Sequence, residues 1–509
     1  MAQPSVVRNV LSNWVGIPLN LSYALFITPL VVRALDKELY GVWSFLNGLL
    51  MYTDLLYLGL GSALVKYVAQ YRASNDHHSV KRVFSVVLGI YATLGLTCLS
   101  VALAASGFVP QVFAEPLSAE AAHVTSITCM LLGLQLFLLF VGSALSGLIC
   151  GCERYDLVSG VAIVMICVRF VATPFVLRAS EPMLGLAMLM VGVAALQAVV
   201  LAVVALTQVP DLPMWPAVPT LAELGLLYRF GLETFFLVVG IKIISYTDIT
   251  VIAATLGASS VALYALPLQL IDFSRACING FTGVQLPRLT GMSARNDSRA
   301  LRDTYLSTTR IACFLGGWLF AGLISLGPAF LNRWVGTAFG TPVQWVLVFL
   351  GLAAFGQVLA LHAPLAFYQS LHLVSFPAKV LLAEAGLNLG LSIWLAPRMG
   401  ISGVALATAL PALLVSALVI PAHLCRRLGV PIRRLVESSV LPGVAMLAAT
   451  LVILQASAWL LPPEDYPSIV ANGLMTLPVA ALVFTLTFPV DERRAVWGML
   501  RRVPEPVQG

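Results

Sequence analysis

Long apolar runs follow one another along the whole chain, and each is long enough to cross a lipid bilayer. A crossing needs about 20 apolar residues, and a helix is the default because it satisfies its own backbone hydrogen bonds. The expected fold class is therefore an all-α polytopic membrane protein. The sequence predicts fourteen spans, at roughly 10–32, 40–64, 83–107, 122–149, 156–177, 182–206, 227–253, 260–286, 303–331, 342–366, 376–396, 401–424, 439–461 and 467–488.

Composition excludes the soluble classes. Hydrophobic residues make up 59% of the chain and charged residues only 10%, whereas about a quarter of a soluble domain is charged. No phosphate-binding Gly-x-x-x-x-Gly-Lys-Ser/Thr loop occurs, no His-Glu-x-x-His motif occurs, and the six histidines are scattered. We therefore expect a non-enzyme with no catalytic residues, no metal, no resident cofactor and no nucleic-acid partner.

The Lys and Arg residues predict the orientation of the chain. With the N-terminus inside, 20 of the 29 fall on cytoplasmic segments and 5 in outside loops. Cytoplasmic loops of membrane proteins carry such an excess of Lys and Arg. Both termini are therefore expected in the cytoplasm.

The chain also repeats itself at an offset of 221 residues. Leu35–Trp43 then aligns with Leu256–Tyr264, and Asn75-Asp76 aligns with Asn296-Asp297. Six predicted spans lie within one offset, so both copies start from the same side, which makes a parallel repeat. We expect two parallel six-helix lobes around a central cavity, plus two extra C-terminal helices. The predicted domains are 1–210, 211–432 and 433–509, with the proline-rich segment 207–224 as the linker between lobes.

Ionisable residues inside spans are the candidate functional groups, because burying them in lipid is costly unless they face a cavity or each other. The basic ones are Arg169, Lys242, Arg275 and Arg310; the acidic ones are Asp54, Glu233, Asp248, Asp272 and Glu384. The eighth span is the richest. Its residues Gln269, Asp272, Arg275, Asn279 and Thr282 are spaced 3, 3, 4 and 3, which places them on one helix face.

Structural roles compete with these functional ones. Asp272 and Arg275 could neutralise each other as a structural pair. Arg169 and Lys242 could each hold a carbonyl or a neighbouring carboxylate. For Glu384 and Glu233, snorkelling or a hydrogen bond between helices is the competing account.

Several short motifs resemble a known family. They are Arg8-Asn9, Pro29–Leu35, Tyr40–Trp43, Asp54–Gly61 and Lys66–Tyr71. Together they resemble bacterial polysaccharide and O-antigen flippases of the multidrug/oligosaccharidyl-lipid/polysaccharide exporter superfamily. The glycine usual after Leu35 is replaced by Asp36, which leaves the local turn open.

The resemblance implies a function. Such flippases move undecaprenyl-diphosphate-linked oligosaccharides across the bacterial inner membrane, through a cationic lumen and by alternating access coupled to an ion or to the membrane potential. Either H⁺ or Na⁺ would serve as the coupling ion. The expected partners of a monomeric transport unit are this glycolipid, membrane lipid, a polysaccharide polymerase and a chain-length regulator. The resemblance also assigns Arg33, at the end of the first span, to the substrate.

Fixed cations can replace the water around a diphosphate, and Arg does so with a bidentate fork. The predicted substrate-binding residues are Arg33, Asn47, Arg169, Lys242, Gln269, Arg275, Asn279 and Arg310. The predicted ion-coupling residues are Asp54, Asp248 and Asp272. At the repeat offset Asp54 aligns with Arg275, so an anionic substrate could compete with Asp54 for Arg275 and free the carboxylate to take up a proton. The competing account is that Asp54 faces its own lobe and bonds a neighbouring helix.

Two other function classes stay open. A drug or cation antiporter of the same superfamily would share the lobes and present an acidic cavity. A membrane-bound glycan polymerase or acyltransferase would need a long outside loop or an acid/base pair at the interface.

Overall fold

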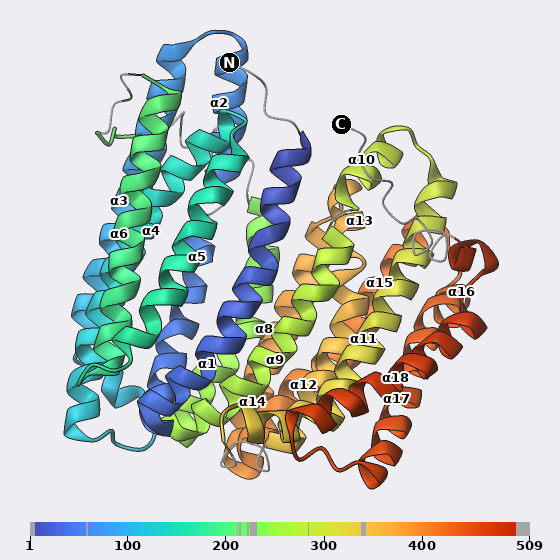
Figure 1. The fold of residues 1–509 in the computed structure, drawn as a ribbon. Helices are drawn as coiled ribbons and strands as arrows, with labels where there is room; N and C mark the ends of the chain where they lie inside the picture. The colour runs from blue at the N-terminus through green and yellow to red at the C-terminus, as the bar shows by residue number, and fades with distance from the viewer. Residues whose placement is uncertain are drawn as a thin grey trace, which may run out of the picture. The chain divides into compact units, whose positions relative to one another are not determined.

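The structure is a computed structural model, and it describes residues 6–494 except 58–59, 211, 213–214, 221–222, 224–231, 284 and 337–342. The side chains of 6–15, 17, 54 and 232–234 also lie outside this description. Every regular element within the described ranges is a helix (Figure 1). The all-α fold class predicted from the apolar runs is confirmed.

The chain divides into two compact units, the first ending at Ala265 and the second beginning at Leu266. The first contains α1 (Val6–Met51), η1 (Tyr52–Tyr57), α2 (Leu60–Ala73), α3 (His77–Ala105), η2 (Val109–Val112), α4 (Ala119–Gly151), α5 (Tyr155–Val176), α6 (Pro182–Gln208) and α8 (Leu232–Leu256). Helix α9 (Ala258–Gly283) runs through the boundary.

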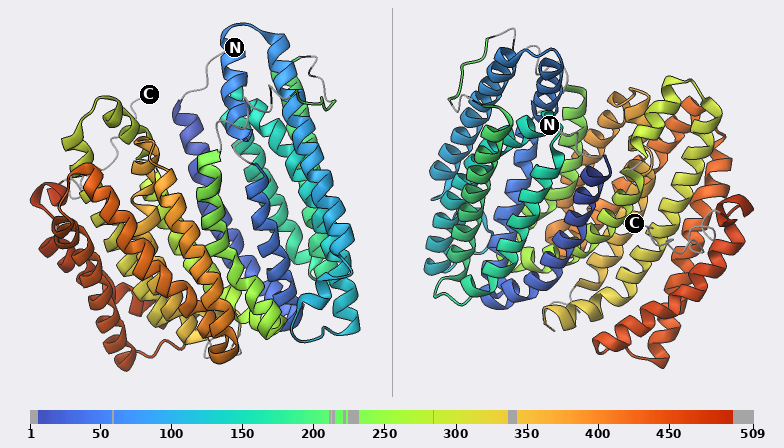
Figure 2. Two further views of the ribbon diagram at one scale, coloured as in Figure 1. Left: turned by 180° about the vertical axis from the view of Figure 1, so that it is seen from behind. Right: turned by 45° about the horizontal axis from the view of Figure 1, so that its top comes forward.

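The second unit continues with nine α-helical segments and π-helical turns (Figure 2). They are α10 (Leu286–Ala294), α11 (Ser298–Trp334), α12 (Gln344–Gln357), η4 (Val358–His362), α13 (Leu365–Ser370), α14 (Ser375–Pro411), η5 (Ala412–Ser416), α15 (Ala417–Leu428), α16 (Ile432–Leu435), η6 (Val436–Val440), α17 (Leu441–Leu460) and α18 (Tyr466–Thr487). Here α10 and α16 are short connecting segments, whereas α11, α14, α17 and α18 are long.

Twelve continuous helical stretches of the described chain are long and apolar enough to cross a membrane. Two of them are much longer than one crossing: Pro18–Tyr57 has 40 residues and Ser375–Leu428 has 54. Each contains one non-helical residue, Asp36 (φ 57°) in the first and Gly400 (φ 62°) in the second. A helix of 54 residues would be about 80 Å long against a hydrocarbon core of about 30 Å. Each stretch therefore holds two spans, which agrees with the fourteen predicted.

Aromatic rings fill the core of the first unit where α2, α3, α4 and α6 meet. Tyr91 and Phe140 are fully buried, and the Tyr57 ring lies 4.8 Å from the Phe140 ring centroid. Helix α8 packs against α1 in this unit, since a β-carbon added at Gly48 would touch Ile249. The lobe boundary predicted at 210/211 stays a prediction.

The internal repeat has the same backbone geometry in both units. Asn75 and Asn296 are both left-handed, with φ values of 56° and 54°. Asp76 then accepts a hydrogen bond from Ser79 N, and Asp297 accepts one from Ala300 N, each at 3.0 Å. In both units an Asn ends one helix and an Asp caps the next.

The repeat also extends beyond the sixth span of each copy. In the first unit Ala217 N donates to the carbonyl of Ser85 at 2.9 Å, and a β-carbon added at Gly89 would lie 2.4 Å from the Ala217 carbonyl oxygen. In the second unit the residues 221 positions later meet again. Arg310 Nε donates to the Ser438 carbonyl at 2.5 Å, and Ser439 Oγ donates to the Leu306 carbonyl at 2.8 Å. The predicted linker is therefore attached to α3 in its described part.

Candidate substrate and ion sites

In the first unit, Arg169 is a membrane-span cation held on an aromatic face. It belongs to α5, and its guanidinium carbon lies 5.2 Å from the centroid of the Tyr23 ring of α1. The Tyr23 hydroxyl lies 3.4 Å from Thr173 Oγ1, one turn further along α5. The Nε of Arg169 is buried and has no hydrogen-bond partner among the described residues. Arg169 therefore has a donor left for a ligand.

Lys242 repeats this arrangement on α8. Its Nζ lies 5.2 Å from the centroid of the Tyr246 ring, and this ring meets that of Tyr52 edge to face at 6.2 Å. The Tyr52 hydroxyl lies 2.9 Å from Thr247 Oγ1. A cation over an aromatic ring is a common way to place a charge in an apolar setting.

Other predicted residues of the first unit are placed differently. Asp248 is buried and accepts a hydrogen bond from the Tyr264 hydroxyl at 2.5 Å. Asn47 donates to the Trp43 carbonyl of its own helix, and Arg33 is exposed near the turn at Asp36. The side chain of Asp54 lies outside the described residues, so its predicted pairing with Arg275 stays a prediction.

In the second unit, Arg275 and Asp272 of α9 form the ion pair that the sequence left open as a structural alternative. Arg275 Nη1 lies 2.9 Å from Asp272 Oδ1. The Asp272 side chain is 47% exposed and that of Arg275 is 13% exposed. The Nε of Arg275 is buried without a described partner. A role in substrate binding stays a prediction for this residue.

A histidine without a predicted role, His362, belongs with Arg275, Asn279, Glu384 and Ser416 to what we call the polar cluster. His362 ends the π-helical turn η4, and its Nδ1 lies 2.5 Å from Oδ1 of Asn279. Its Nε2 is buried and has no described partner. The turn η4 packs against η5 (Ala412–Ser416), the turn that contacts Glu384. The available signal was an ionisable side chain inside a predicted span, which applies to His as well as to Asp or Arg.

Glu384 belongs to the same cluster. It is 1% exposed on α14, so snorkelling is wrong for it. The alternative of a hydrogen bond between helices is confirmed, because Ser416 Oγ of η5 donates to Glu384 Oε2. One turn along, Asn388 donates to Thr408 Oγ1 at 2.9 Å. The Oε1 of Glu384 has no described partner. Two π-helical turns, η4 and η5, thus carry polar groups of one cluster, and π-helical turns are frequent at functional sites.

The other two predicted residues of this unit differ in setting. Gln269 is half-buried on α9. Arg310 of α11 is paired with Glu492: their Nη1 and Oε2 atoms are 2.8 Å apart. Its substrate role stays a prediction, and its contacts connect it to the C-terminal helices.

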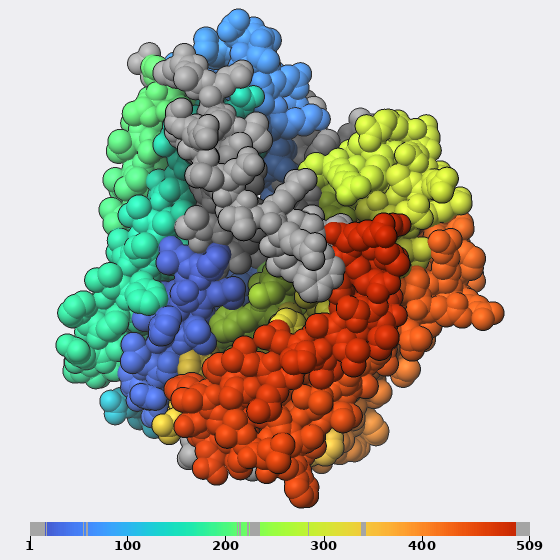
Figure 3. All heavy atoms as spheres, turned by 45° about the vertical axis from the view of Figure 1, so that its right-hand side comes forward, coloured from blue at the N-terminus to red at the C-terminus, as the bar shows by residue number. Residues whose placement is uncertain are grey.

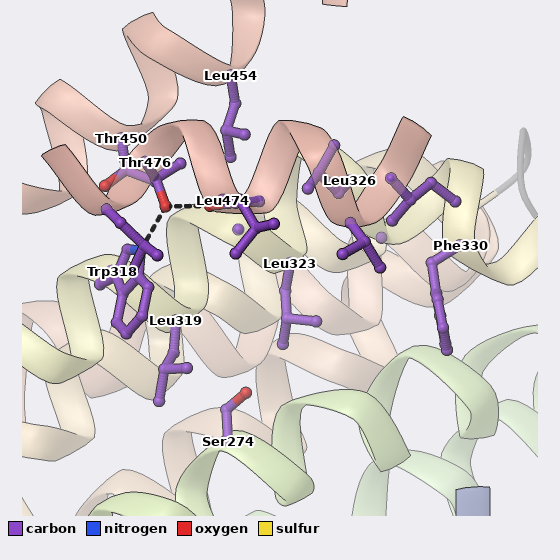
Figure 4. A pocket seen from close by; sticks show the side chains of 16 residues that line it. Ser274, Trp318, Leu319, Leu323, Leu326, Phe330, Thr450, Leu454, Leu474 and Thr476 are labelled. Atoms are coloured by element: carbon purple, nitrogen blue, oxygen red, sulfur yellow. Dashed lines mark hydrogen bonds between the residues drawn. The ribbon is translucent and has the colours of Figure 1, made fainter. Parts of the chain in front are cut away.

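An apolar groove of about 420 Å³ lies among α11, α17 and α18 (Figure 4). Leucine side chains from α11 and α18 point into it, and Phe330 lies at one end (Figure 4). Gly322 and Gly473 also line it, and a β-carbon on either would have no neighbour within 4 Å. Neither glycine projects a side chain into the groove.

Residues 6–293, more than half of the chain, match the sequence model of a family described as "polysaccharide biosynthesis protein". The chain belongs to this family. No curated protein matches it in sequence.

Solved structures share its fold at low identity. An inward-facing multidrug resistance MATE family transporter of the MOP superfamily has a TM-score of 0.67 at 15% identity, over 80% of this chain and 94% of that one. The lipid II flippase MurJ, inward closed, has a TM-score of 0.65 at 12% identity, over 96% and 100%. A MOP superfamily transporter from Pyrococcus furiosus, described for the reverse polarity of its binding pocket, has 0.60 at 15%, over 83% and 95%. This family member therefore has the fold of MOP superfamily transporters.

Proposed function

We propose that the protein is a flippase that carries a prenyl-diphosphate-linked oligosaccharide across the bacterial inner membrane by alternating access. Its polysaccharide biosynthesis family supports a glycan substrate. The fold shared with a lipid II flippase supports a lipid-linked one. Both termini would then lie in the cytoplasm, as the Lys and Arg distribution predicts.

Arg169 carries the proposal at the level of the site. A diphosphate crossing hydrocarbon must exchange its hydration for fixed donors, and a guanidinium offers several in one plane. Arg169 has no acidic partner among the described residues, and Tyr23 fixes its position. The Tyr23 and Phe170 rings, 6.2 Å apart, add apolar faces of the kind that pack on sugars.

The groove of α11, α17 and α18 suits the prenyl chain of the same substrate. Its lining is almost entirely apolar, and it lies among membrane-spanning helices. The prenyl tail of the substrate can remain in this groove, because the tail is hydrocarbon.

We place ion coupling at the polar cluster of the second unit. Glu384 Oε1 is a buried acceptor without a described partner, and it could take up a proton. A carboxylate with neighbouring amide and hydroxyl oxygens also suits Na⁺. Transport driven by H⁺ and by Na⁺ gradients in vesicles would distinguish the two ions.

Replacing Arg169 tests the proposed function. In a strain that lacks the native protein, we expect Arg169→Ala to lower glycolipid export roughly 10- to 100-fold, because charge-assisted bonds to the diphosphate are lost. Arg169→Lys should keep part of the activity, since the charge survives without the fork. Export is measured as lipid-linked glycan reaching the outer leaflet, at equal protein abundance.

The matched control is Arg178→Ala, which removes an exposed arginine that stacks on Phe175 just beyond the same helix. It should leave export unchanged. Full export by Arg169→Ala would contradict the proposal. Export of cationic drugs instead of glycolipid would favour the drug or cation antiporter; a multidrug resistance MATE family transporter has the same fold.

A further inference from the structure

Helix α18 is weakly embedded in the protein. Only 17% of the residues in its most apolar 18-residue stretch are buried, compared with 39% in that of α11, against which it packs. In Figures 1 and 2, α17 and α18 lie at the edge of the second unit, and in Figure 3 their atoms form one of its outer surfaces. Helix α18 packs mainly against α17 and makes few contacts with α11, so its position relative to α11 rests on few contacts and sets the width of the groove.

A single stripe of α11 makes most of the polar and aromatic contacts between α11 and α18. Arg310, Phe314 and Trp318 are spaced by four residues and lie on one helix face. Trp318 Nε1 donates to Thr476 Oγ1 at 2.8 Å (Figure 4). The Phe314 ring meets the Phe488 ring at 5.4 Å. At the far end, the Tyr466 hydroxyl donates to the Arg333 carbonyl at 3.3 Å.

Arg310 joins three parts of the chain at the end of this stripe. Its Nη1 pairs with Glu492, which lies just after α18, and its Nε donates to the Ser438 carbonyl in η6, just before α17. Its guanidinium also lies 5.7 Å from the Phe488 ring centroid. One buried side chain of α11 thus holds both the entry to α17 and the exit from α18.

Comparison of the two copies of the repeat links Arg310 of α11 to the presence of the two added helices, α17 and α18. Its equivalent in the first unit is Gly89, where the linker lies directly on the α3 backbone. In the first copy the equivalent segment leads into the second copy of the repeat, and the described residues there include no helices that correspond to α17 and α18. The charged side chain thus occurs in the copy that must anchor two further spans.

We propose that Arg310 is a positioning residue: with Glu492 it forms a latch that fixes α18 on α11 and so sets the width of the groove. The link between groove width and transport rests on the proposed function. The latch itself does not, because it is a statement about the distance between two helices.

The distance between α11 and α18 tests the latch. Spin labels at Asp303→Cys and Leu486→Cys, both exposed, report it without filling the groove. The eight native cysteines are replaced first, and distances are measured by pulsed electron spin resonance. We expect a narrow distribution in the parent. In Glu492→Gln, which leaves the Arg310 charge without its partner, the population at longer distances should rise at least ~10-fold.

Two further variants keep the test interpretable. Arg310→Lys should retain most of the narrow distribution, because a charge still reaches Glu492. The distance distribution of the double variant Arg310→Gln/Glu492→Gln should be no broader than the broader of those of the two single variants, Arg310→Gln and Glu492→Gln, because the two residues act as a unit. The control is Glu437→Gln, which removes the exposed Arg433–Glu437 pair on the same unit and should change nothing.

An unchanged distance distribution in Glu492→Gln would overturn the latch, whether or not export falls. Lost export at an unchanged distance would instead assign Arg310 and Glu492 to the substrate. A broadened distribution with normal export would support the latch and count against the groove as the site of the prenyl chain. Failure of the proposed function itself shows separately, in the Arg169 variants.

Discussion

The two units make one equivalent contact in different ways. In the first, the segment after α6 touches α3 backbone to backbone, which only Gly89 permits. In the second, the equivalent segment meets α11 through the side chain of Arg310. The first segment leads into a linker, whereas the second leads into two more spans. A duplicated framework can thus keep a contact while its residues change to suit the next part of the chain.

Breaking the contact in the first unit should have the largest effect. A β-carbon at residue 89 would lie 2.4 Å from the Ala217 carbonyl oxygen, so the linker must move away from α3. We expect Gly89→Ala to lower the free energy of unfolding by roughly 1–3 kcal/mol, the usual cost of overpacking. Thermal unfolding of the purified protein in detergent measures it.

Gly192→Ala is the matched control, because a β-carbon on this α6 glycine has no neighbour within 4 Å. It should be neutral or stabilise by about 0.5–1 kcal/mol, since Ala is the better helix former. If Gly89→Ala behaves like Gly192→Ala, the linker is not in contact with α3.

The next comparison concerns Asp36 and its repeat equivalent Gly257, which should respond in opposite directions. Asp36 has φ 57° and ψ −174°, a conformation that is nearly exclusive to glycine. Asp36→Gly should therefore stabilise the protein by about 1 kcal/mol. The lost cap on Leu39 N reduces the gain only slightly, because Gly replaces Asp at a cap at a cost of a few tenths of a kcal/mol.

Gly257→Ala should destabilise by a similar amount, about 1–2 kcal/mol. Its φ is 82°, and the new β-carbon would lie 3.2 Å from Glu115 Oε2. Both variants are compared with the parent by thermal unfolding. Changes of the same sign would show that the two turns are not equivalent in energy.

Much of this comparison could be predicted from sequence, because periodic hydrophobicity and turn residues are local signals. The fourteen spans follow from apolar runs, and the capped turns at Asn75-Asp76 and Asn296-Asp297 follow from an identical dipeptide. The sequence did not decide the turn at Asp36, because Asp replaces the usual glycine. In the structure the backbone there is left-handed, as it is at Gly257. The family follows from the short motifs of the first hundred residues.

The rest depends on packing that a single sequence does not display. Ala217 and Ser438 are not identical, nor are Gly89 and Arg310, so a comparison by residue identity misses their shared contact. The π-helical turns η4 and η5 carry no sequence signal, yet they bring His362 and Ser416 to the polar cluster. The ion pair of Arg310 could not be predicted, because its partner Glu492 lies beyond the last predicted span.

The smallest expected effect concerns the ion pair that holds the linker. Arg82 of α3 binds Glu223 through two parallel hydrogen bonds, of 2.9 Å and 3.0 Å. The hydrogen bond from Arg82 lowers the pKa of Glu223 from 4.5 to about 2. Both side chains are partly exposed, at 42% and 28%, so Glu223→Gln should destabilise the protein only modestly at neutral pH.

The effect should also depend on pH. Because the pKa of Glu223 is lowered on folding, its contribution is complete above pH 4.5 and disappears as the pH falls towards 2. The difference in melting temperature between the parent and Glu223→Gln should therefore be constant from about pH 7 to about pH 5 and shrink below that. Glu492→Gln should cost more than Glu223→Gln at neutral pH, since the Arg310 side chain is only 8% exposed. Equal costs would mean that the second unit anchors its added helices no more firmly than the first unit holds its linker.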